Sequence, residues 1–218
     1  MHAHTVFGVL CCFLLPSWLR SAPVATWPPA ATWPPAATWP PPTDAVDRAR
    51  MLADKISKGI PAVHGAVVNT EGLTLDLFQP AGSLQLMAAS LGIPPAPVLK
   101  PLSDSFTPDT CVSRMLAGGR LYQGLLGVLS QRLDGLDDLW TDLRDLLTQI
   151  AKVKKAAGLS EVEVDQNQSV DLASHLHGDY ELQVAAHLTL WQLRSFCHDM
   201  IRSLRALAAY RPPPSLAR

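Results

Sequence analysis

Apolar residues recur every three or four positions in four stretches of this chain, at residues 44–67, 107–133, 136–157 and 179–210. This period is typical of an α-helix that buries one face, whereas a half-buried strand alternates every second residue. The pattern therefore predicts an all-α protein with four long helices.

Local signals mark several points along these helices. Thr107, Pro108 and Asp109 form a typical helix start, because a Thr hydroxyl can cap a free amide, Pro suits the first helical position and an acid favours the first turn. Gly158 is a typical helix stop. Pro61 predicts a kink within the first helix.

The lengths of the connections predict how the helices run. Helices of about 22 to 32 residues are roughly 33 to 48 Å long, so the connection at residues 134–135 is too short to return along one of them. The second and third helices are therefore expected to be antiparallel. About 39 residues separate the first helix from the second, and about 20 separate the third from the fourth, so either connection can run the length of the bundle. Such spacing is typical of an up-up-down-down bundle with two long crossovers.

The two ends of the chain differ from this domain. Residues 1–21 contain a short apolar run followed by small residues, which indicates a cleaved secretory signal peptide. Residues 22–43 carry a Trp- and Pro-rich six-residue repeat and are expected to form a disordered, extended arm. Residues 211–218 are expected to be a disordered tail. The sequence thus predicts a secreted, extracellular protein with one domain at residues 44–210.

Composition and the absence of catalytic motifs disfavour several classes of function. The 18 Lys and Arg against 19 Asp and Glu, with no strong basic cluster, disfavour nucleic-acid binding. No stretch after the leader is apolar enough for membrane insertion. Phosphate-binding glycine loops, nucleophile elbows and metalloprotease motifs are missing, and His175, His177, His187 and His198 do not have a recognised metal-ligand spacing. We therefore expect neither an enzyme nor a metal or cofactor site, and we expect a monomer.

Two covalent modifications stay open on the sequence alone. Cys111 and Cys197 are the two cysteines left after the leader, and an extracellular pair favours a disulfide. However, Cys197 lies about 13 residues before the end of its helix, roughly 20 Å from the level expected for Cys111. Asn167 begins an Asn-Gln-Ser acceptor sequence for N-glycosylation.

The second helix contains an unusual number of glycines. Gly118, Gly119, Gly124 and Gly127 each cost about 0.8 to 1 kcal/mol relative to Ala in a helix interior. Packing must offset this deficit, so we expect close contacts with another helix or with a crossover at these positions.

Three short motifs lie within the expected domain. Residues 90–97 read Ser-Leu-Gly-Ile-Pro-Pro-Ala-Pro, Cys111 is followed by Gly118 and Tyr122 in the second helix, and residues 195–207 contain Ser-Phe and Leu-Arg-Ala-Leu. Together they resemble the family of long-chain helical cytokines that includes interleukin-6, granulocyte colony-stimulating factor and myelomonocytic growth factor. The resemblance implies a secreted growth factor that binds a type I cytokine receptor and stimulates proliferation and differentiation of granulocyte-lineage cells.

The resemblance also implies a first receptor surface on the first and third helices. Arg48 and Lys55 fall at basic contact positions of the family, and Asp142 and Asp145 fall at acidic ones. Met51 stands where the family has a key acid.

A second receptor surface is implied on the first crossover, where Leu86 falls at an apolar contact position and Ser83 replaces the family's glutamate. Gly119 replaces a signature leucine, and Pro101 replaces a cysteine, so the family's local disulfides are absent. The crossover is therefore expected to be held by packing of Leu84, Leu86, Met87 and Leu91.

Two other functions compete with this expectation. A different interleukin-6-type cytokine would share the fold, although residues 90–97 favour the granulocyte factor. A helical carrier of apolar ligands would need a bundle that opens and takes up hydrophobic molecules.

Overall fold

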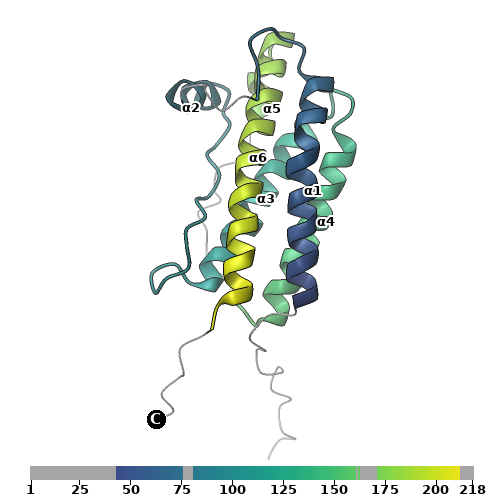
Figure 1. Cartoon of the computed structure of the whole chain (residues 1–218). Coiled ribbons are helices and arrows are strands. Elements are labelled where there is room, and N and C mark those ends of the chain that lie inside the picture. Colours follow the sequence, from purple (N-terminus) through teal and green to yellow (C-terminus); the bar gives the residue numbers. More distant parts are fainter. Residues whose placement is uncertain (1–42, 76–80, 161, 163–170, 212–218) are drawn as a thin grey trace, which may run out of the picture. The chain divides into compact units, whose positions relative to one another are not determined.

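The computed structural model describes residues 43–75, 81–160, 162 and 171–211. The expected signal peptide, the arm, the tail and Asn167 lie outside the described residues, apart from the ends of the arm and tail at Thr43 and Arg211. The described helices are α1 (Thr43–Val67), α2 (Ala81–Ser90), α3 (Pro108–Leu129), α4 (Asp137–Ala156), α5 (Leu172–His175) and α6 (Asp179–Ala209) (Figure 1).

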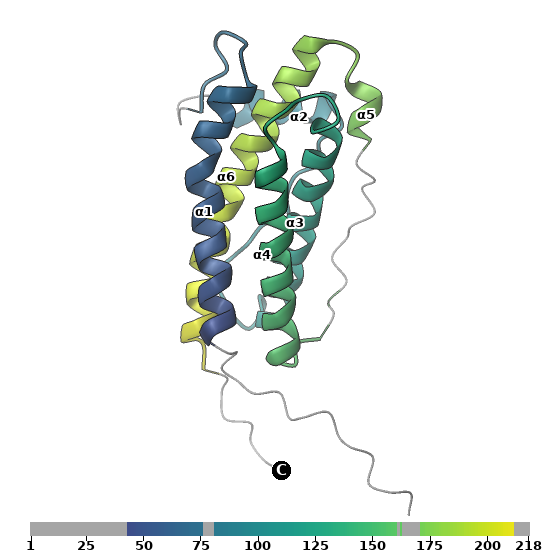
Figure 2. The ribbon, with the colours of Figure 1, turned by 90° about the vertical axis from the view of Figure 1, so that its right-hand side faces the viewer.

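The prediction of an all-α protein with four long helices is confirmed. Among the described residues the only β-type pairing is an isolated bridge between Ser103 and Phe106. Helices α1, α3, α4 and α6 pack as a bundle, in which α1 and α3 each contact both α4 and α6 (Figures 1 and 2). No helix in the described part of the chain is long and apolar enough to cross a membrane.

Contacts between neighbouring helices define their relative directions. Along α1 and α6, Ser57 lies beside His198 while His64, further along α1, lies beside His187, further back along α6. These two helices are therefore antiparallel. Near the end of α1, Val67 approaches Gly135 of the α3–α4 turn, which places this turn where α1 ends (Figure 2).

The helix ends follow the signals in the sequence. The Thr107 hydroxyl accepts a 3.3 Å hydrogen bond from the Thr110 amide and caps α3, as predicted. Gly158 has φ +60° just after α4 and confirms the predicted stop. Helix α3 ends at Leu129, four residues before the predicted Leu133, because the chain turns there toward α4. Pro61 lies on the exposed side of α1, and the helix continues through it.

Close packing explains why α3 contains glycine at two positions, Gly118 and Gly119. A Cβ atom on Gly118 would lie 2.3 Å from the Phe196 ring, and one on Gly119 would lie 2.5 Å from Leu147. These positions confirm the predicted close contacts with α6 and α4. Gly124 has nothing within 4 Å, and a Cβ atom on Gly127 would lie 3.7 Å from Trp140, so the prediction does not hold for Gly124.

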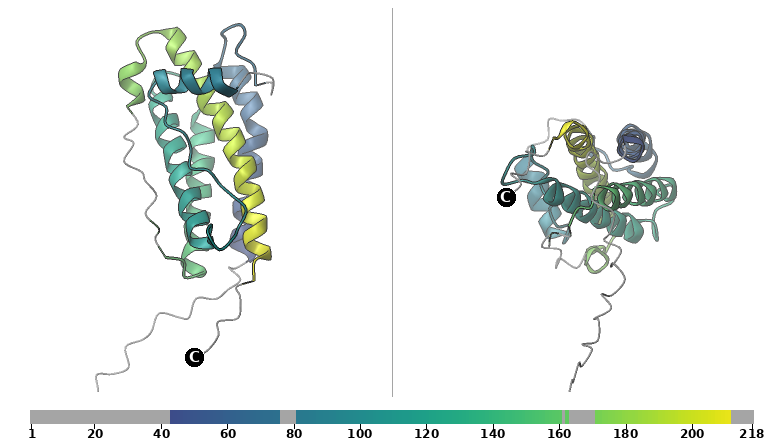
Figure 3. Two further views of the ribbon diagram at one scale, coloured as in Figure 1. Left: turned by 90° about the vertical axis from the view of Figure 1, so that its left-hand side faces the viewer. Right: turned by 90° about the horizontal axis from the view of Figure 1, so that it is seen from below.

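The first long connection is held by apolar contacts and one cation. After α2, the chain runs beside α6 to the start of α3 (Figure 3). Leu84 and Leu91 are buried and Met87 is half-buried, as predicted, whereas Leu86 is 75% exposed and does not contribute to this packing. Arg114 of α3 donates a 2.9 Å hydrogen bond to the Val98 carbonyl and thereby fixes the connection to the bundle.

Cys111 and Cys197 are free, buried thiols, so the disulfide that the sequence left open is not formed in this structure. The reason is that the two cysteines lie at different levels along the axis of the bundle. Cys111 is hydrogen-bonded to Ser203, six residues beyond Cys197 and therefore about 9 Å further along α6. A disulfide needs Cα atoms less than about 7 Å apart.

Candidate functional site

The surface expected on the first and third long helices lies where α1 packs against α4. The Lys55 ammonium group is 2.6 Å from an Asp142 carboxylate oxygen. Lys55 keeps 65% of its side chain exposed, whereas Asp142 keeps 20%. The hydrogen bond that Lys55 donates to Asp142 raises the pKa of Lys55, and the charges of Asp138 and Asp145 add to the rise. The structure thus brings a cation of α1 onto an acidic row of α4.

The helical period explains why these acids share one face. Asp138, Asp142 and Asp145 are spaced by four and then three residues, so they lie in one row along α4. The sequence prediction omitted Asp138, although the same spacing rule could have found it. Asp145 is half-exposed and lies 3.3 Å from Arg144, whose guanidinium group stacks over the Trp140 ring.

On α1, Arg48, Met51 and Lys55 follow the same spacing and share one exposed face. Arg48 forms a 3.0 Å ion pair with Asp44 of its own helix and does not reach α4. Met51 is 72% exposed. Arg48 and Lys55 flank it on this face.

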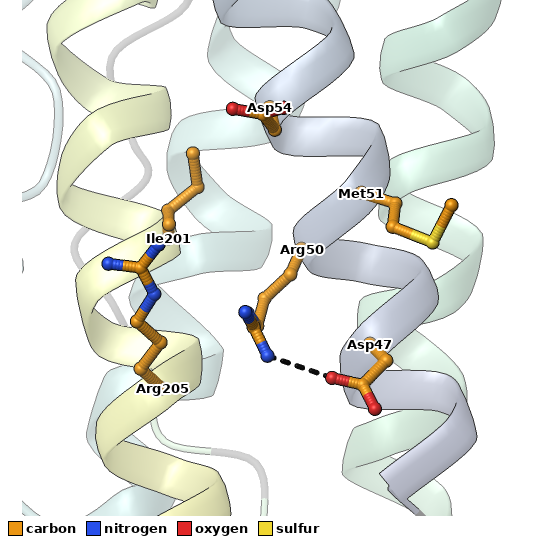
Figure 4. A pocket seen from close by; sticks show the side chains of 6 residues that line it. All are labelled: Asp47, Arg50, Met51, Asp54, Ile201 and Arg205. Atoms are coloured by element: carbon orange, nitrogen blue, oxygen red, sulfur yellow. Dashed lines mark hydrogen bonds and ion pairs between the residues drawn. The ribbon is translucent and has the colours of Figure 1, made fainter.

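A groove on the other side of α1 separates this face from α6. It has a volume of about 350 Å³ and is lined by Asp47, Arg50, Met51, Asp54, Ile201 and Arg205. In Figure 4 the Arg50 side chain points toward the groove and donates a hydrogen bond to Asp47, while the Met51 side chain points away toward α4. Met51 therefore belongs to the α1–α4 face, although it borders the groove.

The second expected surface lies elsewhere on the bundle. Leu86 is exposed on α2, whose main contacts with the bundle are with α6 (Figures 1 and 3). The Ser83 side chain lies outside the described residues. Tyr180, at the start of α6, and Val98 are also exposed and were not predicted.

Among the described residues there is no cluster of three or more potential metal ligands. Burial raises the pKa of the Cys111 thiol to about 11 and that of Cys197 to about 12. Because a thiolate is the reactive form, both cysteines are poor nucleophiles.

No protein-family model matches this chain. No curated protein sequence matches it significantly.

Proposed function

We propose that this chain is a secreted helical cytokine of the granulocyte colony-stimulating factor type, which binds a type I cytokine receptor and stimulates granulocyte-lineage cells. The proposal includes an up-up-down-down arrangement of the four long helices. It also assigns the α1–α4 face to receptor binding.

The packing of the bundle supports the proposed arrangement. Helix α1 is antiparallel to α6, and Lys55 beside Asp142 together with Val67 beside Gly135 makes α1 antiparallel to α4 as well. Long connections before α3 and before α6, with a short one between α3 and α4, are typical of helical cytokines.

The motif at residues 90–97 has a matching structural role. Leu91 and Ile93 are buried, and Gly92 has φ +67°, a backbone conformation that favours glycine. A Cβ atom on Gly92 would also lie 3.0 Å from His175, next to α5. The motif therefore ends α2 inside the first crossover, and the family that it resembles also has it in the first crossover.

The observation that carries the proposal is the α1–α4 face itself. Two of the expected contact residues, Lys55 and Asp142, come from positions 87 residues apart and meet there, with Asp145 and exposed Met51 beside them. Such charges mainly set the encounter rate and the specificity of an interface, while an apolar centre supplies affinity.

The test is binding of the mature chain to the ectodomain of a granulocyte colony-stimulating factor receptor, measured by surface plasmon resonance. Asp145→Lys should raise Kd about tenfold, mainly by lowering the association rate. Asp145 is preferred to Asp142 because Asp145 pairs only with Arg144 of its own helix, whereas replacing Asp142 would also break the contact between α1 and α4.

Asp104→Lys is the matched control, since Asp104 is an exposed acid on the connection before α3 and lies far from α4's acidic row in the chain. Circular dichroism should show equal helicity for all three proteins. If the unmodified chain does not bind, the receptor assignment is wrong. If it binds and Asp145→Lys binds equally well, the α1–α4 face is not the site.

A further inference from the structure

A pair of buried histidines joins α1 to α6 near the end of α1. The Nε2 atom of His64 lies 2.9 Å from the Nδ1 atom of His187, and the two rings meet edge to face with centroids 5.2 Å apart. His187 has no exposed surface and His64 has 7%. At this distance one ring nitrogen donates a hydrogen bond and the other accepts it.

The outer nitrogen of His187 limits which protonation states this pair can hold. This Nε2 atom is buried and has no hydrogen-bond partner. While both rings are neutral, His187 can donate from Nδ1 to His64 and leave only a lone pair at Nε2. If one proton is added and the hydrogen bond between the rings is kept, both outer nitrogens must carry a proton. The charged pair then contains a buried N–H group without an acceptor, which is costly.

The surrounding charges do not compensate for this cost. The pKa of His187 is lowered to about 4, first by burial and then by the neighbouring His64, and burial also lowers the pKa of His64. No carboxylate in the described part of the chain counteracts either shift.

Several packed elements carry titratable groups toward this end of the bundle. They are Lys58 of α1, Glu71 after α1, Arg132 and Asp134 of the α3–α4 turn, Asp137 and Asp138 of α4, and Asp179 and Glu181 of α6, whereas Tyr122 of α3 lies further down, against Phe196. Lys58 pairs with Asp54, and Arg132 donates to the Leu176 carbonyl. The described residues of α2 carry no titratable side chain.

We propose that the His64–His187 pair is an acid-sensitive switch, which holds α1 against α6 at neutral pH and releases this junction in mildly acidic surroundings. The junction has one further polar contact in Gln183, which donates to the Val67 carbonyl at 3.1 Å and accepts from the Asn69 amide at 2.7 Å. Opening should therefore begin at the end of α1 and in the residues that follow it. The switch concerns the bundle's own stability and does not depend on the proposed receptor role.

The direction of the effect follows from proton binding. Both native pKa values lie below the ordinary value of about 6.5, so the unfolded chain binds more protons than the native protein below that pH. The stabilisation by the neutral pair is complete above about pH 6.5 and is lost progressively as the pH falls toward 4. Between pH 7 and pH 5, His187 by itself should raise the equilibrium constant for unfolding about tenfold or more.

The test compares the full mature chain with a double variant, His64→Gln and His187→Gln. Glutamine retains donors and acceptors but does not titrate. Urea unfolding is measured for both proteins at pH 7 and at pH 5. From pH 7 to pH 5, the equilibrium constant for unfolding should rise by a factor at least ten times larger in the unmodified chain than in the double variant. His177→Gln, which changes an exposed histidine, should retain the full pH dependence.

A second measurement keeps the proposal testable if the double variant does not fold. In the native unmodified chain, NMR titration of the histidine ring protons should show His187 still neutral at pH 5. A His187 ring that titrates near pH 6.5 in the native protein would overturn the proposal. An unfolding constant with the same pH dependence in the double variant would overturn it too.

Discussion

Helix α1 contacts its two neighbours through polar pairs of similar length but different surroundings. His64 lies 2.9 Å from His187 inside the α1–α6 interface, and Lys55 lies 2.6 Å from Asp142 at the surface between α1 and α4. Water competes for the exposed pair and salt screens it, so it contributes little to folding. The buried pair has no water to replace a lost partner. Burial, rather than the distance between the polar atoms, therefore decides which of the two contacts contributes more to folding.

This difference divides the roles of the two flanks of α1. The flank toward α6 depends on buried polar contacts and is suited to stability. The flank toward α4 leaves Lys55 and Met51 exposed, so its side chains can be exchanged or can bind a partner without loss of the fold. Substitutions on each flank test this division.

The largest effect is expected for His187→Ala at pH 7.5. The substitution leaves a cavity and removes the partner of buried His64, so the free energy of unfolding should fall by about 2 to 4 kcal/mol. Urea unfolding measures this change. His177→Ala on the exposed loop should stay within about 0.5 kcal/mol. Equal losses in the two variants would break the comparison, because burial would then not decide the cost.

A smaller effect is expected for Ser57→Ala on the same flank. The Ser57 hydroxyl lies 2.8 Å from Nε2 of His198 and is buried, but His198 itself is exposed. Water can therefore take the place of Ser57 at the His198 ring, and the loss should be about 1 kcal/mol. The same urea experiment measures it. A loss of unfolding free energy as large as that of His187→Ala would mean that the exposure of His198 to water does not reduce the cost of losing its partner.

The smallest effect is expected for Lys55→Met on the opposite flank. Methionine retains most of the apolar stem and removes the charge, so the midpoint of urea unfolding at pH 7.5 should stay unchanged within error. Because Asp142 raises the pKa of Lys55, any contribution of the ion pair is present below the ordinary pKa of Lys and is lost as the pH rises above it. A clear fall in the midpoint at pH 7.5 would show that the exposed pair also supports the fold.

The long helices could be predicted because their signal is local and repeated. In α4, Leu139, Leu143, Leu146, Ile150 and Val153 are all buried, and this spacing is visible in the sequence. Helices α2 and α5 were missed because they have 10 and 4 residues, too few for the period to stand out. Leu84, Ala88 and Leu91 form one buried row on α2. In the sequence, so few apolar residues do not distinguish a short helix from an apolar loop.

The candidate surface was predictable only within each helix. Spacing places Asp142 and Asp145 on one face of α4, and Arg48 and Lys55 on one face of α1. It does not say that Lys55 would meet Asp142 or that Arg48 would instead pair with Asp44. The His64–His187 contact links residues 123 positions apart, and no motif marks it.

The sequence by itself determined that this chain forms four long helices, where most of them begin and end, and which face of each is apolar. These features depend on the helical period and on capping residues, which act over a few positions. Only the tertiary structure decided which polar groups meet and whether water reaches them. The height and rotation at which two helices pack set the height difference between Cys111 and Cys197, the contact of Gly118 with Phe196 and the burial of His187. These quantities are sums over many weak contacts along both helices, so no single stretch of sequence contains them.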